Sequence, residues 1–155
     1  MHWIHDDIAV SGLFDLHFGA PISAVLNVCE WRPYDPPKGI AYLHRGFPDV
    51  QPFPIETIWD CVRWLDRRLS RGGKALVHCA EGNSRSVTVA VCYLLFKGLP
   101  LDGIKREVLR RKPFTQFSGI ATSEPQYFQD GFLARWKTLL EVRLRENQDP
   151  VSHEA

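Results

Sequence analysis

A ten-residue segment near the middle of the chain combines residue types that could bind and attack an oxyanion. It reads Val77-His78-Cys79-Ala80-Glu81-Gly82-Asn83-Ser84-Arg85-Ser86. It joins an apolar, β-branched run, predicted to be the most buried strand, to a mostly apolar run predicted to be a helix. A loop that opens a helix gathers unpaired backbone N–H groups at the positive end of the helix dipole. We therefore predict an anion-binding loop, in which Gly82 allows several amides to converge.

The residues at the two ends of this loop supply a nucleophile and a cation. Cys79 is expected at the floor of the loop. Thiols at helix N-termini beside arginine ionise at neutral pH and need no separate base. Arg85 follows six positions later, and a planar guanidinium can hold two oxygens of a phosphate group at once. The alternatives are a buried structural thiol for Cys79 and a surface ion pair for Arg85.

Short β-branched runs alternate with helical patterns along the rest of the chain. The patterns predict strands over residues 8–10, 24–29, 40–44 and 75–78, and helices over residues 55–69, 86–97, 101–111 and 123–146. This alternation is typical of an α/β fold with a central, mostly parallel, twisted sheet of about four to five strands flanked by helices. We expect one catalytic domain over residues 1–146 and a flexible polar tail over residues 147–155.

Length, composition and charge narrow the class of protein. The chain has 155 residues, of which 45% are apolar and 24% charged, as in a single folded domain. Nineteen Lys and Arg residues against 18 Asp and Glu residues give a formal charge of +1. That balance argues against a nucleic-acid scaffold, which needs many phosphate contacts. It does not exclude an anionic substrate, because one pocket can be positive in a neutral protein.

Cysteine usage and the N-terminal residues bear on the compartment. The cysteines at positions 29, 61, 79 and 92 form no Cys-x-x-Cys pair and the six histidines are scattered, so we expect neither a metal site nor a disulfide framework. The first residues lack the features of a signal peptide. The longest uncharged apolar run has eleven residues, about half of what spans a bilayer. We expect a cytoplasmic protein with reduced thiols, no membrane span and no cofactor.

The pattern His-Cys-x5-Arg-Ser over residues 78–86 resembles the signature of the cysteine-dependent protein tyrosine phosphatase superfamily. Its Ser-Arg-Ser ending is most similar to the compact dual-specificity branch, and the similarity extends to residues 25–28, 73–79 and 93–95. The resemblance implies a tyrosine phosphatase-like fold. It also implies hydrolysis of phosphomonoesters through a phosphocysteine intermediate, without a metal or cofactor.

The resemblance further implies a general acid, because a phosphate-ester oxygen leaves poorly unless it is protonated. Relatives supply an aspartate from a loop about thirty residues before the cysteine. Asp49 lies in that position, within the proline-flanked segment over residues 46–52. Asp35 and Asp60 are the rivals, and a solvated loop carboxylate is the alternative for Asp49.

The remaining residues of the signature acquire supporting roles from the same resemblance. Ser86 could hydrogen-bond the thiolate or only cap the helix. His78 could orient the loop or be a core histidine. Glu81 could hold the guanidinium of Arg85 or be an exposed charge. Backbone amides of the phosphate-binding loop would stabilise the equatorial phosphate oxygens; this loop comprises Ala80, Glu81, Gly82, Asn83, Ser84 and Arg85.

The other cysteines and a basic run have weaker functional interpretations. Cys29 ends a strand expected beside the Cys79 strand, so a protective disulfide between the two is a hypothesis. Cys61 and Cys92 fall on helical patterns and are expected to be packing residues. The basic run is expected to be a solvated helix face; it comprises Lys105, Arg106, Arg110, Arg111 and Lys112.

The loop composition also bears on the substrate. None of the five residues between the cysteine and the arginine is basic, whereas a polyanion needs several cations. This favours a singly phosphorylated group, namely phosphotyrosine, phosphoserine or phosphothreonine in a protein or peptide. The short chain predicts a shallow mouth, which could be lined by Arg32, Lys38, His44 and Arg45. The alternatives are a non-protein phosphomonoester (a lipid, nucleotide, RNA end or sugar) and a phosphate-binding module without turnover.

Overall fold

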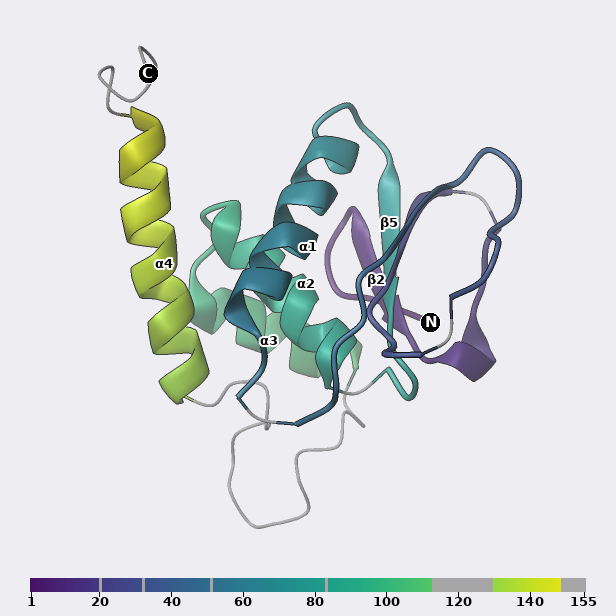
Figure 1. Cartoon of the computed structure of the whole chain (residues 1–155), viewed down its shortest axis with the longest axis horizontal. Coiled ribbons are helices and arrows are strands. Elements are labelled where there is room, and N and C mark those ends of the chain that lie inside the picture. The colour runs from purple at the N-terminus through teal and green to yellow at the C-terminus, as the bar shows by residue number, and fades with distance from the viewer. Residues whose placement is uncertain (20, 32, 51, 83, 113–129, 149–155) are drawn as a thin grey trace.

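The computed structural model describes residues 1–19, 21–31, 33–50, 52–82, 84–112 and 130–148. Five strands form one sheet in the order β1-β2-β5-β3-β4 (Figure 1). The strands are β1 (His2–Trp3), β2 (Ile8–Ser11), β3 (Ile22–Asn27), β4 (Ala41–His44) and β5 (Lys74–His78). Only the β1–β2 pair is antiparallel; the other three pairs are parallel. The mostly parallel sheet predicted from the sequence is therefore confirmed, with β5 at its centre.

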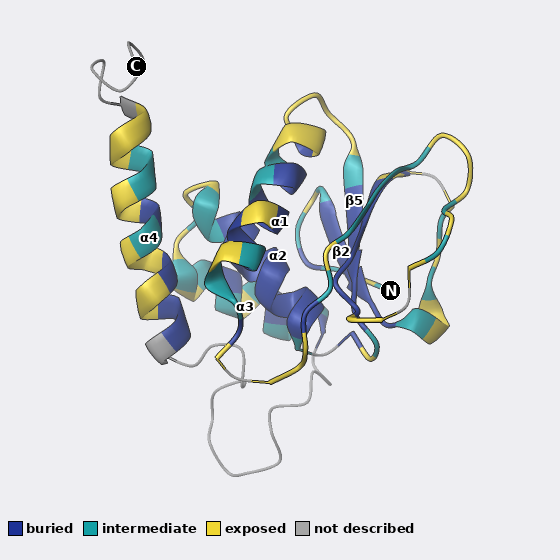
Figure 2. Ribbon diagram, in the orientation of Figure 1, coloured by how far each residue is buried: buried dark blue, intermediate teal, exposed yellow. Residues whose placement is uncertain are grey.

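Helices pack against one face of this sheet in the described part of the chain (Figure 1). They are α1 (Ile55–Leu69), α2 (Arg85–Phe96), α3 (Leu101–Arg111) and α4 (Asp130–Gln148), whereas the short 3-10 helix η1 (Leu13–Asp15), which follows β2, lies on the other side of the strands. Helix α2 is almost wholly buried between the sheet and its neighbours (Figure 2). Its first turn follows directly from the loop after β5, which points the positive end of its dipole at that loop.

Alternation along the strands divides the core in two. Ala75 and Val77 of β5 face the large cluster shared with the helices. Leu76, between them, faces a smaller cluster with Ala9 and Val25 on the other side of the sheet. Successive side chains of a strand point to opposite faces, so a strand buried on both faces holds the following loop rigidly.

Several element boundaries differ from the sequence-based expectation, most of them by one or two residues. The β1 strand is not predicted at all, and β3 ends at Asn27, two residues before the expected end. Helix α4 is described from Asp130, and its expected start at residues 123–125 lies outside the described residues. Helix α4 also continues to Gln148, so the expected tail begins later than residue 147. Residues 149–155 lie outside the described residues.

In the ranges that the structure describes, no helix combines the length and the apolar character needed to cross a membrane.

Candidate active site

The loop between β5 and α2 is held by backbone hydrogen bonds from the strands on both sides. The Cys79 amide donates to the Ser11 carbonyl at the end of β2, at 3.3 Å. The Val28 amide, just after β3, donates to the His78 carbonyl at 2.9 Å. The Leu13 amide donates to the Ala80 carbonyl at 2.9 Å. Two segments distant in sequence, one at the end of β2 and one just after β3, therefore fix the start of the loop.

The Cys79 thiol lies at the bottom of this loop, with its side chain only 2% exposed. The Gly82 amide points at the sulfur, with the nitrogen 3.1 Å from Sγ. The Ser86 hydroxyl oxygen lies 3.3 Å from the same sulfur. The Cys79 sulfur therefore lies against one backbone N–H donor and one side-chain hydroxyl. In the structure the Cys79 thiol donates to the Ser86 hydroxyl oxygen, and donation from Ser86 to the thiolate remains a prediction.

Gly82 gives the loop a shape that no other residue could adopt without strain. Its φ angle is +79°, in the left-handed region. A β-carbon at this position would lie 2.6 Å from the Gly12 nitrogen and 2.6 Å from the Ser11 carbonyl carbon. The loop therefore packs directly on the backbone that follows β2, and glycine is required there for two separate reasons.

The Arg85 guanidinium is 8% exposed and is anchored from a distant loop. Its Nη1 donates to the Phe47 carbonyl at 3.0 Å. Its Nε is buried and has no hydrogen-bond partner among the described residues. Glu81, which was expected to hold this guanidinium, is exposed, and the partner in the structure is the Phe47 carbonyl instead. A bound oxyanion would satisfy the buried Nε.

Asp49 is exposed in the loop after β4, two residues beyond the Phe47 carbonyl. The bond between Phe47 and Arg85 thus ties the Asp49 loop to the anion-binding arginine. Of the rival carboxylates, Asp60 lies on α1 and forms an ion pair with Arg45 at 3.7 Å. The position of Asp49 is compatible with a general acid, and that role remains a prediction.

His78 is fully buried behind the loop and contacts an aromatic side chain that the sequence analysis does not identify. Its Nε2 lies 2.6 Å from the Tyr34 hydroxyl, and the two rings stack with centroids 5.6 Å apart. Its Nδ1 faces the Cys79 carbonyl at 3.4 Å. Burial lowers the pKa of His78 to about 4, so the imidazole is neutral at pH 7. A neutral His78 supplies no charge to the loop, and its role in orienting the loop remains a prediction.

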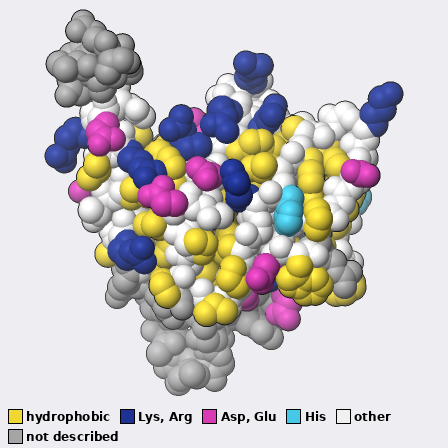
Figure 3. Space-filling view, in the orientation of Figure 1, with side chains coloured by type: hydrophobic (Ala, Val, Ile, Leu, Met, Phe, Trp, Pro, Cys, Tyr) yellow, Lys and Arg dark blue, Asp and Glu magenta, His cyan; other side chains and the backbone are white. Residues whose placement is uncertain are grey.

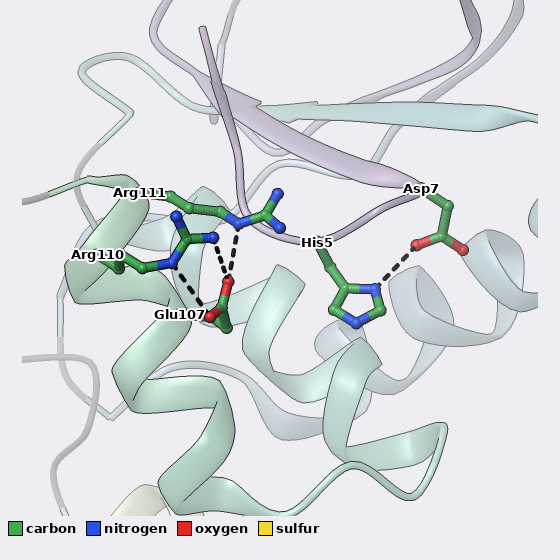
Figure 4. Close-up of polar contacts among 5 residues, drawn as sticks. All are labelled: His5, Asp7, Glu107, Arg110 and Arg111. Carbon is green, nitrogen blue, oxygen red and sulfur yellow. Dashed lines mark hydrogen bonds and ion pairs between the residues drawn. The ribbon is translucent and has the colours of Figure 1, made fainter.

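The basic run on α3 is only partly the solvated face that the sequence predicts. Arg110 and Arg111 turn toward Glu107, each with a nitrogen 2.9 Å from the same carboxylate oxygen (Figure 4). These bonds lower the pKa of Glu107 to about 2. Lys112, by contrast, is 7% exposed. This corrects the expectation for Lys112, because an amphipathic helix buries the stem of a lysine at its C-terminal end.

Lys112 also contributes to the electrostatics of the loop. Burial lowers the pKa of Lys112, while the negative charges of Cys79 and Asp15 act in the opposite direction. The charge of Lys112, just past the end of α3, therefore interacts with Cys79. The loop sequence contains no hint of this, because the residue comes from another element.

The other predicted residues fall into three groups. Cys61 and Cys92 are packing residues, as expected, and burial raises the pKa of Cys61 to about 12 and that of Cys92 as well. Cys29 is buried just after β3 as a free thiol; its pairing with Cys79 remains a prediction. His44 is turned inward, with its Nε2 2.6 Å from the Cys29 carbonyl oxygen.

The remaining mouth and loop residues are only partly described. Lys38 is exposed, and the exposed Arg45 is paired with Asp60, so the predicted cationic mouth is not formed by His44 and Arg45. Arg32 and Asn83 lie outside the described residues.

Fold and site together define an α/β domain with a buried cysteine and arginine at the two ends of an anion-binding loop. No family model matches the sequence. The chain is 42% identical over 79 residues to Dual specificity protein phosphatase 1 of Arabidopsis thaliana, a match covering 50% of this chain and 40% of that relative. The chain therefore spans less than half the length of this curated relative.

Solved structures give the same result over nearly the whole chain. The active form of Tk-PTP superposes with a TM-score of 0.62 at 27% identity, covering 86% of this chain and 95% of that one. Human DUSP28 superposes with a TM-score of 0.74 at 19% identity, covering 92% and 99%, and supports the fold alone. In sequence, signature loop and fold, the chain is therefore similar to the compact, dual-specificity-type phosphatases of the cysteine-dependent tyrosine phosphatase superfamily.

Proposed function

We propose that this protein hydrolyses phosphomonoesters on proteins, removing phosphate from phosphotyrosine and from phosphoserine or phosphothreonine through a phosphocysteine intermediate. The observation that carries the proposal is the environment of Cys79. Its sulfur faces the Gly82 amide at 3.1 Å and the Ser86 hydroxyl at 3.3 Å. The buried Arg85 Nε, which has no partner in the described chain, offers a donor to the phosphate. The phosphatase relatives support the same activity.

The first step transfers the phosphoryl group to sulfur. The Cys79 thiolate attacks phosphorus, the sulfur–phosphorus bond forms and the phosphorus–oxygen ester bond breaks. Asp49 gives its proton to the leaving oxygen, so the alcohol departs neutral. The loop amides and Arg85 bind the equatorial phosphate oxygens. The arrangement of these donors is fixed before the substrate binds. In this mechanism the main contribution of the fold is a rigid set of donors that neutralises the charge of the three equatorial phosphate oxygens.

The second step returns the enzyme to its starting state. The Asp49 carboxylate takes a proton from water, the water oxygen attacks phosphorus, and the sulfur–phosphorus bond breaks. Ser86 donates a hydrogen bond to the departing thiolate, which makes the sulfur a better leaving group. Inorganic phosphate leaves, and the proton count is restored because Asp49 has given and regained one proton.

The four cysteines are free thiols. This supports a reducing compartment, and we place the protein in the cytoplasm.

The test is p-nitrophenyl phosphate hydrolysis followed by rapid-quench mass spectrometry. We expect turnover that is lost in Cys79→Ser and kept in Cys61→Ala, a buried cysteine of α1 away from the loop. During turnover an added mass of one phosphoryl group is expected on the peptide that contains Cys79. A label on any other residue would overturn the mechanism. Absence of turnover with tight phosphate binding would instead identify a binding module.

A further inference from the structure

Large apolar side chains are exposed at unusual places in this chain. Among the described residues, four are strongly exposed: Phe14 by 100%, Trp31 by 66%, Val50 by 64% and Val142 by 48%. Val142 lies on α4. The other three belong to the segments that follow β2, β3 and β4, respectively. Single exposed apolar residues are ordinary, but three of the four lie in one set of loops.

Those three loops meet at one edge of the sheet. Strands β2, β5, β3 and β4 are parallel neighbours, so the segments after their carboxyl ends lie at the same edge as the Cys79 loop, which follows β5. In open parallel sheets this edge is where ligands bind. Because β5 lies between β2 and β3, Phe14 comes from one side of the loop and Trp31 and Val50 from the other.

Backbone contacts tie each segment to the site. Phe14 follows Leu13, whose amide donates to the Ala80 carbonyl at 2.9 Å. Val50 lies three residues after Phe47, whose carbonyl accepts from Arg85. The segment before Trp31 is tied to the site by the Val28 amide, which donates to the His78 carbonyl at 2.9 Å. It also packs on the segment of Phe47, since a β-carbon on Gly46 would lie 2.5 Å from the Cys29 carbonyl oxygen.

Three of the four charged residues within two positions of these side chains are acidic, and the fourth, Arg32, lies outside the described residues. The three acidic residues are Asp15, Glu30 and Asp49, and Glu81 of the loop is exposed as well. In Figure 3 the lower right edge shows mainly hydrophobic and acidic side chains, whereas Lys and Arg side chains gather higher on the same face. This negative charge would repel a second phosphate on the substrate, while an apolar group of the substrate would contact apolar side chains.

We propose that Phe14, Trp31 and Val50 form an apolar rim that binds large apolar side chains adjacent to a single phosphorylated residue of a protein substrate. The proposal rests on the proposed phosphatase activity and specifies its substrate class. The phosphate is held by the Cys79 loop, and the neighbouring residues of the peptide lie across the rim. Burial of one aromatic side chain of the rim and one of the peptide strengthens binding by about ten-fold. The rim therefore determines which phosphorylated sites are dephosphorylated and not how fast the phosphate-ester bond breaks.

The experiment compares kcat/KM for three substrates of the full chain. The first is a phosphotyrosine peptide with Leu on each side of the phosphorylated residue, the second has Ser at both positions, and the third is p-nitrophenyl phosphate. We expect the Leu peptide to exceed the Ser peptide by about ten-fold or more. In Phe14→Ser and Trp31→Ser the ratio between the two peptides falls by about five- to ten-fold. In Val142→Ser, an exposed apolar residue on α4, the ratio stays at the wild-type value.

The outcomes separate this proposal from the one it rests on. If the wild-type chain does not hydrolyse p-nitrophenyl phosphate at all, the proposed phosphatase function itself is overturned. Turnover of p-nitrophenyl phosphate with equal kcat/KM for the two peptides would overturn only the rim. Preferential turnover of a phosphomonoester presented on phosphatidylcholine vesicles, lost in Phe14→Ser, would assign the rim to a lipid surface and overturn the peptide assignment. Circular dichroism melting of each variant confirms that the exposed substitutions leave the fold intact.

Discussion

Replacing Gly82 by alanine tests whether the backbone of the phosphate-binding loop, rather than its side chains, carries the activity. The new β-carbon would lie 2.6 Å from two backbone atoms that follow β2, where ordinary contact begins at 3.4 Å. Relief of that contact requires a shift approaching one ångström in the loop. The Gly82 amide, now 3.1 Å from the Cys79 sulfur, moves with it. Because misplacement of a catalytic group by about 1 Å costs on the order of 10²-fold, we expect kcat to fall by about two orders of magnitude.

The stability cost of Gly82→Ala has two parts. A left-handed φ costs a non-glycine residue about 1–2 kcal/mol, and overpacking against fixed backbone adds about 1–3 kcal/mol. The sum is about 2–5 kcal/mol, and at about 2–4 °C per kcal/mol in a domain of this size the melting temperature falls by roughly 4–20 °C. Differential scanning fluorimetry and p-nitrophenyl phosphate kinetics at 15 °C measure the two effects separately.

Two other glycines serve as matched controls for this variant. Gly98 has a φ of +90° with no atom within 4 Å of the added β-carbon, so Gly98→Ala bears only the backbone cost. Gly12 makes the reciprocal contact, at 2.8 Å from the Ala80 carbonyl oxygen, without a left-handed φ. We expect Gly98→Ala to keep its kcat and Gly12→Ala to lose part of it. If Gly82→Ala matches Gly98→Ala in both melting temperature and kcat, the reasoning is refuted.

Four further predictions concern side chains. Asp49→Asn slows the chemical step by about 10²–10⁴-fold while vanadate still binds, as single-turnover kinetics and inhibition measure. Ser86→Ala slows breakdown of the phosphoenzyme by roughly 10- to 100-fold, the value of a hydrogen bond to a charged group, and a product burst reveals it. His78 stays neutral in the fold down to about pH 4, whereas an unfolded histidine takes its proton at about pH 6.5, so urea-unfolding stability falls as pH drops through that window, by up to about 3 kcal/mol. Peroxide yields a Cys29–Cys79 peptide in non-reducing mapping.

Each of these predictions has an outcome that contradicts it. Loss of vanadate binding in Asp49→Asn would make that residue structural, and an equal loss of rate in Asp35→Asn would reopen the choice of acid. An unchanged burst in Ser86→Ala would leave the hydroxyl as a helix cap only. His78→Asn should lose the histidine part of the acid dependence, and an identical slope in both proteins would assign the dependence to other groups. Absence of the Cys29 cross-link rules out the protective disulfide.

The chemical centre of the site could be predicted from the sequence because it is contiguous. Cys79, Gly82, Arg85 and Ser86 belong to one strand–loop–helix unit, so their types and spacing could be recognised in the sequence, and the structure brings Gly82 and Ser86 to the Cys79 sulfur. Asp49 could be proposed only by its spacing from the cysteine. Its loop reaches the site through the bond between Phe47 and Arg85, which joins residues 38 positions apart.

The surroundings of this centre depend on contacts between distant segments, and no local pattern encodes them. Tyr34 pairs with His78 across 44 positions, the charge of Lys112 interacts with Cys79 from just past the end of another helix, and Phe14 comes from beyond β2. Whether such a residue is buried against the loop or exposed at its rim depends on strand order and register, which are properties of the whole sheet. The sequence by itself therefore predicted the proposed reaction chemistry, since that prediction follows from residue types at short spacing. Only the tertiary structure decided which groups tune the thiol and which surface meets the substrate, since long-range packing brings them together.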